Sequence, residues 1–177
     1  MGLQLIFVVE TNKKCKSDWI YIKDTIDNFY EYDKAHVRLT PVYMDGKGNY
    51  KKKEAEALRW ITQYASMKET NKSEVIYCFD CDDYDIKAED LYFLQEAEKF
   101  CRDKGYHFVW FCKDIEEVYI GRKVPDNKKQ SEATVFKEKK LVRNIDATKL
   151  SYTNYKANTS NIMKVLEQYL DKKCKNP

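Results

Sequence analysis

A buried strand that ends in a run of acidic residues is the feature that most constrains the fold of this chain. Val75 to Phe79 is an unbroken run of β-prone residues, and four aspartates follow it between positions 80 and 85. A strand that is apolar on both sides is typical of the parallel sheets of α/β proteins, whose faces are covered by helices. Ligands bind at the carboxyl ends of such strands, so the acidic run marks a candidate functional site.

Three further segments carry the apolar pattern of a strand, at residues 3–9, 37–44 and 106–112. Pro41 places the second of these at an edge of the sheet or at a bulge. Helices are expected from residue 17, over residues 52–68, 91–101 and 115–120, and after residue 160. This alternation predicts one α/β domain with a central, mostly parallel sheet of about four strands, flanked by helices on both faces.

The formal net charge is +3, but the two signs are unevenly distributed. Residues 1–120 hold 18 Lys or Arg and 23 Asp or Glu, which gives −5, whereas residues 121–177 hold 14 and 6, which gives +8. We therefore distinguish an α/β core, residues 1–121, from a basic C-terminal segment, residues 122–177, whose closing helix is expected to pack on the same domain. A metal site beside a phosphate-binding surface would produce this asymmetry, and so would a solvated lysine-rich face.

The six cysteines are scattered and fit reduced, mostly buried thiols. Cys78 and Cys81 form a C-x-x-C pair, but residues three apart at a strand end face opposite ways, and no second pair completes a zinc site. No apolar stretch approaches the roughly 18 residues of a membrane span. The N-terminus also lacks the pattern of a signal peptide, so we expect a cytoplasmic protein without a membrane partner.

Carboxylates from three segments are expected at one edge of the sheet. Glu10 ends the first strand, Asp80 and Asp82 end the third, and Glu116 follows the fourth. Like-charged carboxylates repel one another unless they share a cation, and Mg2+ or Mn2+ is the cation that such oxygen ligands favour. The alternative is an acidic turn that caps the next helix.

Glu10 at the end of the first strand, together with Asp80-Cys81-Asp82 after a later strand, resembles the signature of the topoisomerase–primase (TOPRIM) domain. The chain resembles most closely the RloB-like and OLD-family nuclease group, in which a later Glu precedes an apolar helix, as Glu116 does here. The resemblance covers roughly residues 3–121. It implies a metal-dependent nuclease that cleaves DNA or RNA, with a role in phage defence or mobile-element conflict.

The sequence departs from that group in two places. Thr11 stands where the family commonly has Gly, and the segment around Ile115 lacks the family's Pro and aromatic residues. The second departure leaves the further ligand open among Glu116, Glu117 and Asp85. Because the sequence carries no recognisable ATPase or topoisomerase module, we expect an ATPase or other protein partner to be a separate chain.

The resemblance also implies roles for individual residues. Asp80 and Asp82 would hold Mg2+ or Mn2+, Glu10 would be a ligand or a general acid/base, and Glu116 would complete a second metal position. In the loop after Glu10, Lys13 would neutralise the scissile phosphate, with the neighbouring lysines 14 and 16 as alternatives. The basic C-terminal segment would hold the nucleic-acid backbone without reading its sequence.

Two other classes of protein compete with a nuclease. In the first, the chain is a non-catalytic nucleic-acid-binding or regulatory module that acts with a partner protein. In the second, it is a phospho-acceptor of the receiver type, in which an Asp pair and a strand-end Asp bind Mg2+. Receivers place the acidic pair early in the chain, whereas here the early strand ends in Glu10 and the pair follows the third strand.

Overall fold

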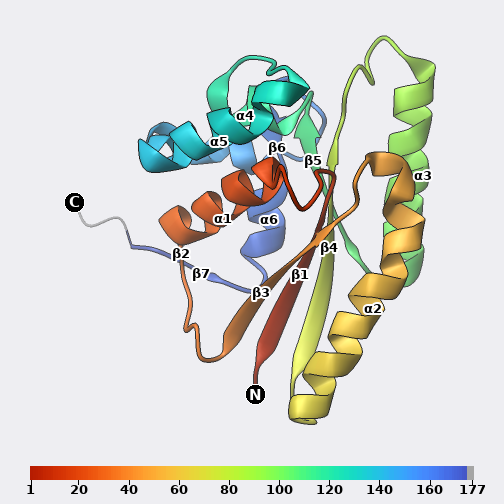
Figure 1. The fold of residues 1–177 in the computed structure, drawn as a ribbon, viewed down its shortest axis with the longest axis vertical. Coiled ribbons are helices and arrows are strands. Elements are labelled where there is room, and N and C mark those ends of the chain that lie inside the picture. The colour runs from red at the N-terminus through yellow and green to blue at the C-terminus, as the bar shows by residue number, and fades with distance from the viewer. Residues whose placement is uncertain (175–177) are drawn as a thin grey trace.

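The parallel sheet expected from the sequence forms the centre of the computed structural model, which describes residues 1–174 (Figure 1). Its strands, in spatial order, are β3 (Val37–Tyr43), β1 (Leu3–Val9), β4 (Lys72–Asp80), β5 (His107–Cys112) and β6 (Thr159–Ser160). The first four are parallel, and β6 pairs with β5 in the antiparallel direction. A separate antiparallel ladder joins β2 (Tyr30–Glu31) to β7 (Asp171–Lys172).

Helices cover both faces of the sheet (Figure 1). The helices are α1 (Ser17–Phe29), α2 (Tyr50–Met67), α3 (Ala88–Lys104), α4 (Ile115–Ile120), α5 (Lys129–Glu138) and α6 (Ile162–Leu166). Helices α2 and α3 lie on one face, and the other four lie on the opposite face. None of the helices in residues 1–174 combines the length with the apolar character that a membrane crossing requires.

Alternate residues of the central strands serve two separate cores. Along β4, Ile76 packs with α1 and its neighbours, whereas Tyr77 and Phe79 pack under α2 and α3. Cys78 and Cys81 likewise fall in different cores, which agrees with the prediction that they face opposite ways. Burial on both faces explains why the sequence of β4 is an unbroken apolar run.

The predicted fold class is confirmed, and so are the positions of the four main strands. Pro41 lies in β3, an edge strand, where a residue without a backbone N–H is tolerated because one side of the strand has no neighbouring strand to pair with. Gly105 ends α3 with a φ of 71°, the left-handed conformation that favours glycine. Helix α1 begins at Ser17, as expected, with residue 16 as its N-cap, and the two-residue strand β6 was not predicted.

The C-terminal segment packs on the same domain as the core. Its strand β6 extends the central sheet, and its helix α5 places Ala133 and Phe136 in the core under α1. The Phe136 ring meets the ring of Tyr21 edge to face, with a centroid distance of 5.0 Å. This contact packs α5 against α1.

Two isoleucines provide a test of this packing. Ile76 is fully buried in β4, whereas Ile86, in the loop that follows the strand, is 74% exposed. Ile76→Ala should lower the free energy of unfolding by about 3 kcal/mol, because it removes buried methyl groups and leaves a cavity. Ile86→Ala should change it by less than about 0.5 kcal/mol in the same urea titration. Equal losses in the two variants would contradict the central position of β4.

Candidate functional site

Glu10 and Asp80 meet where the adjacent strands β1 and β4 end. The backbone N–H of Asp80 donates a hydrogen bond of 2.8 Å to Oε1 of Glu10. Asp80 itself accepts a hydrogen bond of 2.9 Å at Oδ1 from the backbone N–H of Ile115, the first residue of α4. The two carboxylates are therefore held at the carboxyl edge of the sheet, as the sequence predicted.

Two more acidic side chains approach this pair. Asp18, in the first turn of α1, is 5% exposed and accepts a 3.1 Å hydrogen bond from the backbone N–H of Thr11. Glu116, in the first turn of α4, is fully buried. The charges of both act on Asp80. Asp18 was not predicted, because an acid in the first turn of a helix is ordinary without knowledge of what packs against it.

Burial and mutual repulsion disfavour the ionised forms of these acids. Burial is the largest cause that raises the pKa of Glu10 to about 8, and the negative charges of Asp18 and Asp82 add to it. Burial, followed by the charge of Glu10, holds the pKa of Asp80 well above its usual range. Burial also raises the pKa of Glu116 to about 7. The cluster therefore holds more carboxylates than cations, and an added cation would relieve the repulsion between the carboxylates.

A lysine from the C-terminal segment reaches into the cluster. The ammonium of Lys129, the first residue of α5, lies 3.2 Å from Oε2 of Glu116. Neither Glu116 oxygen accepts a well-formed hydrogen bond within the described part of the chain. Burial alone would lower the pKa of Lys129, but the charges of Glu116, Asp80 and Asp18 raise it. Lys129 is thus the counter-charge of the buried acids.

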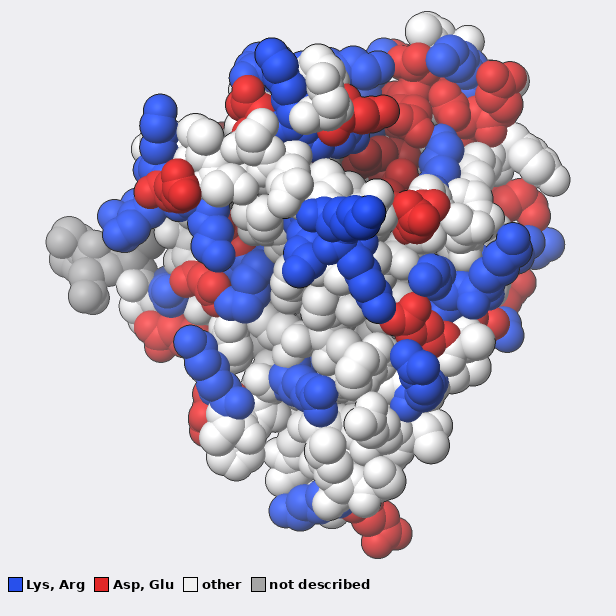
Figure 2. All heavy atoms as spheres, in the orientation of Figure 1, with Lys and Arg blue, Asp and Glu red and all other residues white. Residues whose placement is uncertain are grey.

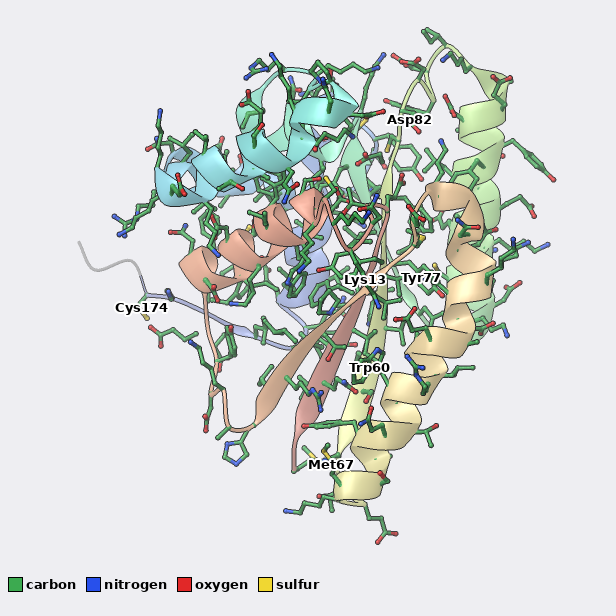
Figure 3. All side chains as sticks on the ribbon, in the orientation of Figure 1. Lys13, Trp60, Met67, Tyr77, Asp82 and Cys174 are labelled. Carbon is green, nitrogen blue, oxygen red and sulfur yellow. The ribbon has the colours of Figure 1, made fainter. Side chains whose placement is uncertain are left out.

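Asp82 lies on the rim of the site (Figure 3). Its carboxylate is 43% exposed and forms an ion pair with Lys47, whose ammonium also lies 3.1 Å from Oδ1 of Asp90. The charge of Asp82 still acts on Glu10. The structure therefore keeps Asp82 beside the predicted cluster and gives it a lysine partner of its own.

The structure separates the residues that the sequence left as alternatives. Glu116 joins the buried acids, whereas Asp85 pairs with Lys113 at 3.1 Å, and the charge of Glu117 acts on the same lysine. Lys13 does not line the acidic pocket. It lies in the neighbouring hollow, over the middle of the face seen in Figure 3.

The acids line a pocket of about 430 Å³, with Glu10, Asp18, Asp80 and Lys129 in its wall. Figure 2 shows Asp and Glu side chains gathered in a hollow between α4 and the loop from β4 to α3. Within residues 1–174, no three or more His, Cys, Asp or Glu side chains are already arranged as a metal site. The carboxylate oxygens are turned to backbone N–H groups and lysines, so a cation would have to compete with these partners.

Comparisons of the chain with protein-family models, with curated proteins and with solved structures give no match. The candidate site therefore rests on its own geometry.

Removing Lys129 should destabilise the protein, because Glu116 would lose its counter-charge in a buried position. At pH 8 in a chelator, Lys129→Met should lower the free energy of unfolding by about 3 kcal/mol in urea titrations. The double variant Glu116→Gln/Lys129→Met should recover most of this loss. Lys128→Met, a matched change at the exposed neighbouring lysine, should have little effect. Independent, additive effects at positions 116 and 129 would contradict the pairing.

Proposed function

We propose that this chain is a metal-dependent nuclease of TOPRIM type, which cleaves phosphodiester bonds in DNA or RNA. The observation that carries the proposal is the hydrogen bond from the backbone N–H of Asp80 to the Glu10 carboxylate, which holds Glu10 against the end of the strand that carries Asp80. The resemblance to the RloB-like and OLD-family nucleases supports the same activity, and a role in phage defence follows from it by analogy.

The donor set of the pocket fits Mg2+ or Mn2+. Glu10 and Asp80 line the pocket and offer hard oxygen ligands, and the buried Glu116, whose charge acts on Asp80, would be a third. Asp82 on the rim could join them if Lys47 released it. Among the described residues, Glu116 has the ammonium of Lys129 beside Oε2 but accepts no well-formed hydrogen bond, so a cation could replace that lysine as its partner. Bound there, the cation would stabilise the charge that develops on the phosphodiester oxygens during cleavage.

Residues of the chain would hold the substrate and move its proton. Glu10 serves as a ligand or as the group that exchanges a proton with the substrate, as the resemblance implies. Lys129, already inside the pocket wall, could contact the phosphate once a cation balances Glu116. Lys13, in the adjacent hollow, would neutralise the phosphate from the other side. We propose nucleic acid as the substrate and a separate ATPase or other protein as partner.

A second candidate is a non-catalytic nucleic-acid-binding or regulatory module. One observation favours it: the acids are already partnered within the chain, Glu116 by Lys129 and Asp82 by Lys47. In that case the pocket would stabilise the fold, and nucleic acid would bind without being cleaved.

A cleavage assay distinguishes the two candidates. With Mn2+, the chain alone should cleave plasmid or single-stranded DNA or RNA slowly, and a chelator should stop the reaction. Glu10→Gln and Asp80→Asn should lower the rate by roughly 100-fold or more, because each removes a charged ligand. The matched control Glu117→Gln changes an acid outside the cluster and should cleave within about twofold of the wild type.

Two results of this assay would reject the nuclease. If Asp80→Asn cleaves as fast as the wild type, the activity belongs to another site or to a contaminant. If the wild type binds nucleic acid but cleaves none with either cation, the second candidate replaces the first.

A further inference from the structure

Cationic side chains from two segments gather beside the acidic pocket. Lys13 and Lys14 lie in the loop after β1, and Lys52 and Arg59 lie on α2. We call these four residues the basic patch. All four are exposed, and none forms an ion pair with any residue of 1–174. Figure 2 shows Lys and Arg side chains in the middle of this face, where Figure 3 labels Lys13, and further ones along α2.

The basic patch continues into the acidic pocket through two hollows. The first, of about 410 Å³, is lined by Lys13, Lys14 and Lys53, and the second, of about 570 Å³, by Lys52, Lys53 and Arg59. Asp45 lines both hollows and also the acidic pocket. The three depressions therefore follow one another across this face of the molecule.

The patch keeps its positive charge despite the acids near it. Lys53 is neutralised by Glu56, at 3.2 Å, which leaves Asp45 as the acid at the junction against four unpaired cations. Lys52 and Arg59 are seven residues apart, so the patch extends about 10 Å along α2. A positive track of this kind attracts a polyanion by releasing its counterions.

The basic C-terminal segment presents fewer free charges than its composition suggests. Lys129 is paired with Glu116 inside the pocket. Arg122 lies 2.9 Å from Glu132, and Lys172 lies 2.7 Å from Glu167. The pair with Glu116 lowers the net excess of this segment, whereas the other two pairs hold cations against acids that the +8 already counts.

We propose that the sugar–phosphate backbone of a nucleic acid binds along the basic patch and leads from α2 into the acidic pocket. The nature of this polyanion rests on the proposed function. The surface itself is assigned by the four unpaired cations and by the depressions that join them to the acids. The core, and not the C-terminal segment, then carries the main nucleic-acid contacts.

Two variants with the same change of charge test this surface. The patch variant carries Lys13→Gln, Lys14→Gln, Lys52→Gln and Arg59→Gln. The control variant carries Lys137→Gln, Lys139→Gln, Arg143→Gln and Lys149→Gln, all at exposed positions of the C-terminal segment. Binding of a fluorescent single-stranded DNA or RNA oligonucleotide is measured by anisotropy in a chelator, over a range of salt concentrations. Thermal melting of both variants shows whether they remain folded.

The patch variant should bind at least about tenfold more weakly at low salt. Its plot of log affinity against log salt should also be flatter by about 3, since each lost contact to a single strand removes about 0.7. The control variant should stay within about twofold of the wild type.

Three results would overturn the proposal: equal weakening in both variants, weakening in the control variant alone, or no salt-dependent binding by the wild type. None of these decides whether the chain binds a cation, because the assay contains a chelator. The assay can therefore reject the basic patch as the binding surface without rejecting the proposed nuclease activity, which the cleavage assay tests.

Discussion

The crowding of four carboxylates at one edge of a parallel sheet, three of them buried and Glu10 half-buried, is the constraint on which the rest of this structure depends. Ionised acids at such a place repel one another and lose hydration, which raises the pKa of Glu10 and Asp80. The fold offsets this cost with backbone N–H donors at Asp80 and Ile115 and with the ammonium of Lys129. A cation would offset it further, which links the stability of the fold to the proposed activity.

The basic C-terminal segment is part of the site as well as a source of charge. Helix α5 is anchored by Phe136 against Tyr21 of α1, and its first residue, Lys129, thereby reaches Glu116. Lys47 likewise forms ion pairs with Asp82, on the rim of the site, and with Asp90. Each half of the acidic site thus has its own lysine, and a cation that enters must compete with these ammonium groups. The cations of the basic patch take no part in this balance.

The sequence was sufficient to predict the parallel sheet and the proximity of Glu10 to Asp80. Each buried strand is a short run of apolar residues, and the polar residue that follows the run marks the end of the strand. Glu116 could have been separated from Glu117 by the helical spacing of Ile115, Val118 and Tyr119, which sets the buried face of α4. Lys129 could not be chosen from its neighbours, since its position depends on how α5 packs. The strand β6 lacks a local signal, because its two residues are fixed only by pairing with β5.

Direct binding of Mn2+ tests the central claim that these carboxylates form a cation site. Electron paramagnetic resonance reports the free ion, so a titration of the metal-free protein gives the number of sites and their affinity. The account predicts saturable binding by the wild type, loss of that binding in Asp80→Asn, and binding unchanged in Glu117→Gln. The absence of saturable binding by the wild type, or equal binding by Asp80→Asn, would contradict it.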